Sequence, residues 1–167
     1  MPPADTWLFA LTFITALGCA LVAGIFLAFS SFVMGALARI SPPSGIAAMQ
    51  AINVVVLNPG FLGLFMGTAL ACAVLLLCAL WRGQAPGALY LGTGSLLYLL
   101  GTFGVTMAFN VPRNNALARQ DPASSEAAGF WRGYVANWTM WNHVRTLAAL
   151  LAAVLLAYPL IRFPGGA

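Results

Sequence analysis

The chain has 167 residues, of which 62% are hydrophobic and only 6% are charged. Seven basic and three acidic side chains are too few to cover a surface that faces water. This composition excludes a disordered chain and a soluble α/β enzyme. It also excludes a nucleic-acid-binding protein, because the scattered arginines form no basic patch.

Long uncharged segments indicate that the chain crosses a membrane. About 20 apolar residues in a helix cross the roughly 30 Å hydrocarbon core. The uncharged runs cover residues 6–38, 40–81, 83–112 and 146–161. We therefore expect an all-α fold, a four-helix transmembrane bundle that forms a single domain over residues 1–167. The predicted spans are about 7–37, 59–81, 88–109 and 126–161.

Turn and cap signals separate these spans. Prolines and a glycine at 41–45 end the first one, and Asn58 before Pro59 is typical of a helix start. The connection at 84–87 is short, which predicts that the second and third helices are antiparallel neighbours. Residues 110–126 form the one long polar stretch, which we expect to connect the third and fourth spans.

Four spans place both termini on the same side of the membrane. The opposite side carries four arginines, and the side of the termini carries two. The four are Arg39, Arg113, Arg119 and Arg132, and the two are Arg82 and Arg162. Positively charged connections favour the cytoplasm, so the sequence predicts an integral protein of a bacterial cytoplasmic membrane with its termini outside.

Polar side chains gather at one end of the predicted bundle. All seven asparagines and the only histidine lie in the two connections or at the helix ends of that side. Capping and loop hydration explain several of these asparagines equally well. Others lie directly beside apolar spans, where a polar group is costly unless it is paired or lines a cavity. We therefore expect a polar and aromatic pocket at one membrane interface, formed by Asn110, Arg113, Asn142, His143 and Arg145.

The start of the fourth span adds aromatic residues to this end. At about 100° per residue, one helical face within an arc of roughly 100° carries Trp131, Tyr134, Trp138, Trp141, Asn142 and Arg145. Tryptophan and tyrosine are common at the headgroup level of membranes, which explains the rings but not the amide and the cation. Ring faces beside a cation also suit a flat polycyclic ligand. His143 projects roughly 150° away from the centre of this stripe.

Five segments resemble a known family. They are GIFLAFSSFVMGAL at 24–37, MQAIN at 49–53, the Asn58-Pro59 pair, FNVPRNNALA at 109–118 and WTMWNHVRT at 138–146. They look like the DUF1772, or anthrone oxygenase-like, family of small four-helix membrane proteins. The resemblance implies that fold and, for fungal polyketide-pathway members, oxidation of an anthrone to an anthraquinone by O₂ without a known cofactor. It implies motif positions at Asn110, Pro112, Asn114, Trp138, Trp141, Asn142 and Arg145.

This chemistry needs a base and a group that stabilises an oxyanion. Histidine is the side chain best suited to proton transfer near neutral pH, so His143 is the candidate base. Asn142, Asn110 and Arg145 are the candidate oxyanion donors. The candidate substrate-binding residues are Trp131, Tyr134, Trp138, Trp141, Arg113, Asn114 and Asn58. The expected partners are a small aromatic substrate, O₂ and the lipid bilayer.

Two other functions remain open from the sequence. His143 could be an axial ligand of haem in a membrane redox protein, although a single histidine without a spaced second ligand disfavours it. The three cysteines lie in apolar runs and have no metal-binding spacing, so we expect no metal site. A non-enzymatic binding protein or small transporter is the second alternative. It predicts acidic residues or broken helices in the membrane, which the first three spans do not contain.

Overall fold

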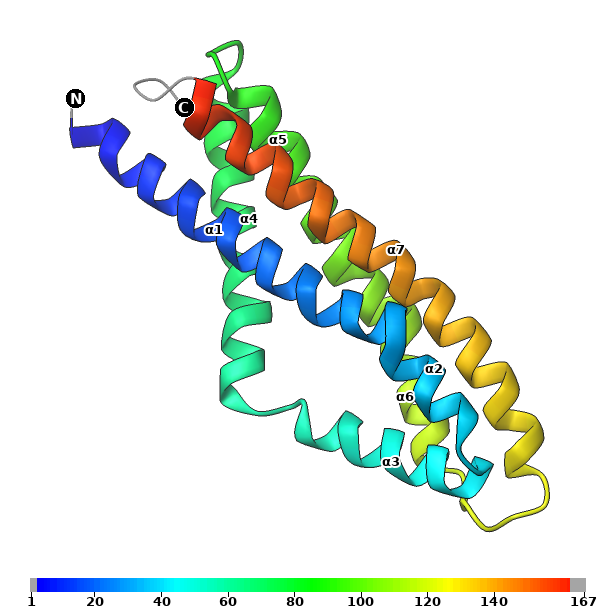
Figure 1. The fold of residues 1–167 in the computed structure, drawn as a ribbon. Helices are drawn as coiled ribbons and strands as arrows, with labels where there is room; N and C mark the ends of the chain where they lie inside the picture. The colour runs from blue at the N-terminus through cyan, green and yellow to red at the C-terminus, as the bar shows by residue number, and fades with distance from the viewer. Residues whose placement is uncertain (1–2, 163–167) are drawn as a thin grey trace.

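The computed structural model describes residues 3–162, and every secondary-structure element in this part of the chain is a helix. The first helix, α1 (Pro3–Ala28), continues through a π-helical turn, η1 (Phe29–Val33), into α2 (Met34–Arg39). Figure 1 shows this first element running diagonally along the whole bundle. The apolar run predicted at 7–37 is therefore one long membrane helix that contains a local widening near its end.

A separate helix lies across the end of the bundle remote from the termini (Figure 1). This helix, α3 (Pro42–Val55), begins at Ser41, whose hydroxyl accepts a hydrogen bond from the Ser44 amide. The next helix, α4 (Pro59–Arg82), begins at Asn58, whose side chain accepts from the Phe61 amide. Both starts combine a polar cap with proline in the first turn, because proline has no amide hydrogen to leave unpaired there.

The third span extends further than predicted. It consists of α5 (Ala88–Leu96), the π-helical segments η2 (Leu97–Gly104) and η3 (Thr106–Asn110), and α6 (Val111–Ala118). We expected it to end near residue 109, before the polar stretch. It continues because Pro112 falls in the first turn of α6, where a missing amide hydrogen is tolerated. The Arg113 side chain also donates to the Phe109 carbonyl at 2.7 Å.

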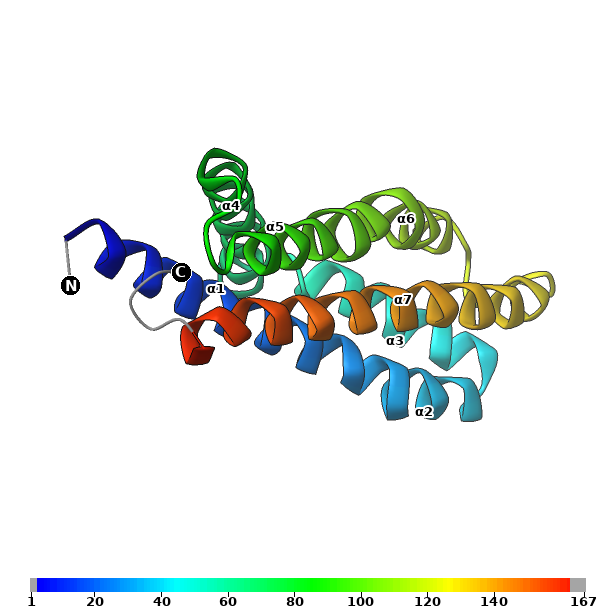
Figure 2. The ribbon, with the colours of Figure 1, turned by 90° about the horizontal axis from the view of Figure 1, so that it is seen from above.

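The last helix, α7 (Ala127–Arg162), is the central element of the bundle. Figure 2 shows it between α5–α6 on one side and α1–α2 on the other, and it packs against all of these helices. Its 36 residues correspond to roughly 54 Å, which exceeds the hydrocarbon thickness of about 30 Å. The polar first half of α7 can therefore extend beyond the apolar part of the membrane.

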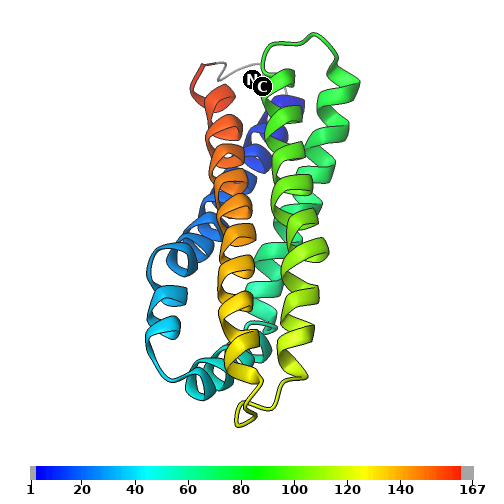
Figure 3. The same cartoon turned by 90° about the vertical axis from the view of Figure 1, so that its right-hand side faces the viewer.

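Four helices are long and apolar enough to cross a membrane: Thr6–Arg39, Pro59–Arg82, Ala88–Ala118 and Ala127–Arg162. Large apolar side chains on their outer surfaces are well exposed, as at Leu70 (69%), Leu77 (66%) and Leu100 (68%). Lipid tails can cover such surfaces, whereas water cannot do so without cost. The protein is therefore an integral membrane protein. The described ends of α1 and α7 lie at the same end of the bundle (Figure 3).

Two apolar clusters fill the interior. The upper cluster, on the side of the termini, joins α1, α4, α5, η2 and the second half of α7, and includes Phe26, Phe65, Tyr98 and Ala149. The lower cluster joins α2, α3, α6 and the first half of α7, and includes Met34, Met49, Trp131 and Trp138. Along α7 the segment between Trp138 and Ala149 separates the two clusters. That segment carries the polar residues of the candidate site.

Candidate functional site

A layer of polar side chains lies between the two apolar clusters. On α7 it contains Asn142, Arg145 and Thr146, all buried. The facing helices contribute polar side chains that hydrogen-bond to this part of α7: Ser30, Thr102, Thr106 and Asn110. Each of these four residues belongs to a π-helical segment, η1, η2 or η3. Since π-helical turns often occur at functional sites, their convergence on this layer makes it a candidate functional site.

Asn142 joins α1 to α7 through its side chain. It is fully buried, and its Nδ2 donates to the Phe26 carbonyl and to Ser30 Oγ, each at 2.7 Å. Its Oδ1 accepts from Arg145 Nε at 2.9 Å. All the hydrogen-bonding directions of the amide nitrogen are thus used, and the amide is held in one orientation.

Arg145 lies inside the bundle with only 6% of its surface exposed. Besides the bond to Asn142, its Nη1 donates to Thr106 Oγ1 at 3.3 Å. The guanidinium carbon lies 3.8 Å from the Phe26 ring centroid and 4.9 Å from the Trp138 ring centroid. The two rings and the two polar partners hold the cation in place by cation–π contacts and hydrogen bonds.

No carboxylate compensates this charge within residues 6–162. The chain has three acidic residues, Asp5, Asp121 and Glu126. Asp121 and Glu126 are exposed in the connection that precedes α7, and Asp5 belongs to the first turns of α1. A buried charge without a counterion is expensive. An anionic or electron-rich ligand near Arg145 would lower this cost.

Asn110 borders the same layer from the third span. Its side chain is 1% exposed, and its Nδ2 donates to the Trp138 carbonyl at 3.2 Å. Its Oδ1 is buried and has no hydrogen-bond partner in the described part of the chain. The structure therefore joins Asn142 directly to Arg145 and places Asn110 against α7 one turn before Asn142, at the Trp138 carbonyl.

The aromatic stripe of α7 is largely packed on itself. The rings of Trp131 and Tyr134 stack with centroids 5.5 Å apart, and those of Tyr134 and Trp138 are 6.5 Å apart. Asn114 Oδ1 accepts hydrogen bonds from Trp138 Nε1 at 2.7 Å and from the Tyr134 hydroxyl at 2.9 Å. All three rings are buried in the lower cluster. Their predicted role in binding a substrate stays a prediction.

Trp141 lies apart from the buried rings. It is half-buried and stacks on Phe109 of η3, with centroids 3.6 Å apart and an interplanar angle of 5°. Asn58, which was also expected to contact substrate, is exposed and caps α4 in the structure. Its Nδ2 donates to the Val55 carbonyl, so both ends of its amide hold the turn before that helix.

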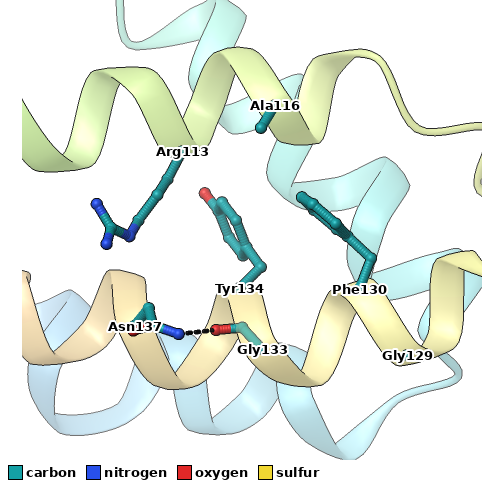
Figure 4. A pocket seen from close by; sticks show the side chains of 7 residues that line it. All are labelled: Arg113, Ala116, Gly129, Phe130, Gly133, Tyr134 and Asn137. Carbon is teal, nitrogen blue, oxygen red and sulfur yellow. Dashed lines mark hydrogen bonds between the residues drawn. The ribbon is translucent and has the colours of Figure 1, made fainter.

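Arg113 lies on an open groove of about 420 Å³ between α6 and α7. Figure 4 shows its side chain extending along the groove, while Tyr134 and Phe130 rise from α7 toward α6. Asn137 donates to the Gly133 carbonyl on the same helix. The structure thus directs Arg113 to this groove and does not join it to the Asn142–Arg145 pair.

His143 lies on another face of α7. It is exposed and lines a second open groove, of about 430 Å³, between the end of the first helix and α7. The structure does not bring its side chain to Arg145. The groove does include Ser30, the residue that hydrogen-bonds to Asn142.

Several residues of the polar layer were not expected from the sequence. Ser30, Thr102 and Thr106 lie within apolar runs, where single hydroxyl side chains are common in membrane helices. Phe26 contacts the Arg145 cation. The sequence does not identify which of the 11 phenylalanines in the chain makes this contact. One usable signal was present: Thr102 and Thr106 are one helical turn apart, which places both hydroxyls on a common face.

The described residues contain no group of three or more His, Cys, Asp or Glu side chains that could hold a metal ion. The family model described as anthrone oxygenase matches residues 61–155, more than half of the chain. Comparisons with curated proteins and with solved structures give no match. The matched segment contains Asn110, Asn142 and Arg145, which meet in the polar layer. Together with the four apolar helices, this match shows that the chain belongs to the anthrone oxygenase family.

Proposed function

We propose that this protein is a membrane-embedded, cofactor-independent oxygenase of a bacterial cytoplasmic membrane that oxidises a flat phenolic or anthrone-like compound to a quinone with O₂. The observation that carries the proposal is Arg145, a buried cation without a carboxylate partner within residues 6–162. Such a charge favours a neighbouring anion, and the anion of a phenol or anthrone is the species that reacts with O₂. Membership of the anthrone oxygenase family supports the same chemistry.

The reaction begins with removal of a proton from the methylene carbon of the anthrone. The resulting anion is delocalised onto the carbonyl oxygen, and it passes one electron to O₂. The organic radical and superoxide combine to a peroxide, which loses water and leaves a new carbonyl group. One oxygen atom of O₂ enters the quinone and the other leaves as water, so the substrate and O₂ balance without another oxidant.

The protein contributes a proton acceptor and a positive potential. In this proposal His143 takes the proton, since its imidazole is exposed to a groove wide enough for small molecules. The Arg145–Asn142 pair stabilises the negative charge that develops on the substrate oxygen. The pair is fixed by hydrogen bonds and ring contacts, so little reorganisation is needed when the charge appears.

The proposal can be tested with purified protein in nanodiscs and emodin anthrone as the substrate. Because anthrones oxidise spontaneously, the relevant quantity is the rate of O₂ uptake and quinone formation above the rate with empty nanodiscs. Arg145→Met should lower this excess rate by about 10²-fold. Arg132→Met is the matched control, since Arg132 is an exposed arginine of the same helix.

An absorption spectrum and a metal analysis of the same preparation separate this function from the haem alternative. A Soret band or stoichiometric metal in the active protein would contradict the cofactor-independent reaction. An excess rate of zero, with folded protein and several hydroxylated anthrones, would contradict the proposed activity itself.

A further inference from the structure

The groove beside His143 is open and large enough for a small aromatic molecule. Its volume of about 430 Å³ lies within the range of roughly 300–1,000 Å³ that is typical of ligand pockets. Met34 and Gly35 line one wall, and Met140 and His143 line the other. A Cβ atom at Gly35 would meet no atom within 4 Å, so the groove is unfilled at this point. The exposed Met140 side chain is flexible and can adapt to the face of a flat ligand.

A chain of hydrogen bonds connects this groove to the buried cation. Arg145 Nε donates to Asn142 Oδ1 at 2.9 Å, and Asn142 Nδ2 donates to Ser30 Oγ at 2.7 Å. Ser30 itself lines the groove. Both donors in this series of hydrogen bonds point from the cation toward the groove, and hydrogen bonds aligned in this way strengthen one another. The positive charge therefore acts on the groove through Ser30.

The hydroxyl proton of Ser30 can be offered to a ligand. Ser30 Oγ accepts from Asn142, and its proton has Thr146 Oγ1 as an acceptor at 3.3 Å, which is long for a bond between hydroxyl groups. Thr146 uses its own proton in a 2.6 Å bond to the Asn142 carbonyl. A ligand oxygen at the usual distance would thus compete well for the Ser30 proton, since typical bonds between oxygen atoms are about 2.7 Å.

We infer that this groove is the substrate site of the proposed oxygenase and that Ser30 donates a hydrogen bond to the substrate oxygen on which negative charge develops. The inference rests on the proposed function. It adds the groove as the place where the substrate binds and Ser30 as a residue that contacts the substrate. The methylene carbon and the carbonyl oxygen lie at opposite positions of an anthrone's central ring. Ser30 from η1 and His143 from α7 line the groove from different helices, which allows a donor and a base to face these two positions.

A further hydroxyl group in the groove lacks a partner. Threonine hydroxyls in these helices commonly donate to the carbonyl four residues earlier, as Thr15, Thr68 and Thr146 do. Thr139 lines the groove, but its Oγ1 is buried and has no hydrogen-bond partner among the described residues. A phenolic hydroxyl of the substrate can become its partner once the side chain turns Oγ1 toward the groove, since buried polar atoms usually have one.

The position of the site can be tested by filling each of the two grooves beside α7. Gly35→Leu fills the His143 groove, and Gly129→Leu fills the Arg113 groove; neither glycine has an atom within 4 Å of a new Cβ. The probe is 1,8-dihydroxyanthraquinone, whose binding to protein in nanodiscs is followed by quenching of tryptophan fluorescence. Gly35→Leu should weaken binding at least tenfold, and Gly129→Leu should leave the affinity within about twofold of that of the unmodified protein. The reverse order, or equal affinities, would overturn the inference.

The role of Ser30 has its own kinetic test. Ser30→Ala should lower kcat of the excess oxidation rate by about 10²-fold and change KM by less than about threefold, since the bond strengthens as charge develops. Ser30→Thr should restore most of the rate. Ser125→Ala is the matched control, because Ser125 is exposed in the connection before α7 and lines neither groove. Equal losses in Ser30→Ala and Ser125→Ala, or no rescue by threonine, would overturn the role of Ser30.

The proposed activity and the proposed binding site can be contradicted separately. If the unmodified protein has no excess rate, the proposed oxygenase function fails, while the fluorescence experiment still decides whether the groove binds a hydroxylated tricyclic compound. If the protein is active and Gly35→Leu keeps full activity and affinity, the proposed function stands and the groove is not its substrate site.

Discussion

The Arg145 guanidinium carbon lies 3.8 Å from the centroid of the Phe26 ring, which joins the buried cation of α7 to the core of α1. Phe26 also contributes its carbonyl oxygen to Asn142 Nδ2 at 2.7 Å. One residue of the first helix thus holds both members of the polar pair, once by its ring and once by its main chain. This arrangement fixes the pair although no ion pair with Arg145 exists in the described structure.

Replacing Arg145 by methionine should remove activity without lowering stability. Burial of a cation without a counterion costs several kcal/mol, and an apolar side chain of similar length avoids this cost. The lost hydrogen bond to Asn142 costs about 1–3 kcal/mol and partly offsets the gain. Thermal unfolding in detergent should therefore give a Tm equal to or above that of the unmodified protein. A strong decrease in Tm would show that Arg145 is primarily a structural residue.

Asn114 and its neighbour Asn115 provide a matched pair for the lower cluster. Asn114 Oδ1 accepts from Tyr134 and Trp138, so Asn114→Ala leaves two donors without their partner. We expect a loss of about 2–3 kcal/mol in the free energy of unfolding. Asn115 is exposed, so Asn115→Ala should change the free energy of unfolding by less than about 0.5 kcal/mol. Denaturant titration in mild detergent measures both, and equal effects would contradict the role of Asn114.

The sequence predicted the four spans well because uncharged length is a direct consequence of crossing a bilayer. It predicted the end of the third span less well, since the amides and Arg113 after residue 109 resemble a loop. The structure shows why they are helical: Arg113 covers the Phe109 carbonyl, and Asn110 is buried against α7. Contacts with another helix decided the outcome, and a linear pattern does not contain them.

The candidate site was predictable in part. Helical spacing placed Asn142 and Arg145 on one face of α7, and the structure joins them directly by a hydrogen bond. The same spacing separated His143 from that face, and the structure places His143 on the groove between the end of the first helix and α7. The role of Ser30 was not predictable, because it depends on how η1 lies against α7. A π-helical turn within a run of apolar residues has no sequence pattern from which it can be predicted.

Gly45 should tolerate no larger residue. A Cβ atom there would lie 2.8 Å from Trp131 and 2.9 Å from the Leu37 carbonyl, so α3 can approach α7 and α2 closely only with glycine at this position. We expect Gly45→Ala to destabilise the protein by about 1–3 kcal/mol. Gly63→Ala is the control, since a Cβ at Gly63 meets no atom within 4 Å, and alanine there should be neutral or slightly stabilising. Thermal unfolding of both variants checks this, and equal Tm values would contradict the close contact.

The distribution of arginines predicts the orientation of the protein in the membrane. Gln84 lies in the connection between α4 and α5, at the end of the bundle near the termini, and Ser125 lies in the connection before α7 at the opposite end (Figure 1). Four arginines at the Ser125 end against two at the Gln84 end predict that the Ser125 end faces the cytoplasm. In a variant without Cys19, Cys72 and Cys78, Gln84→Cys should react with a membrane-impermeant maleimide on intact cells.

Ser125→Cys should react with the same reagent only after the membrane is permeabilised. The reverse labelling pattern would show that the termini are cytoplasmic, and labelling of both sites from one side would contradict the four-span arrangement itself. With the Ser125 end inside, the polar first half of α7 and both of its grooves lie toward the cytoplasmic side of the membrane. A substrate made in the cytoplasm could then reach His143 from that side without crossing the apolar core.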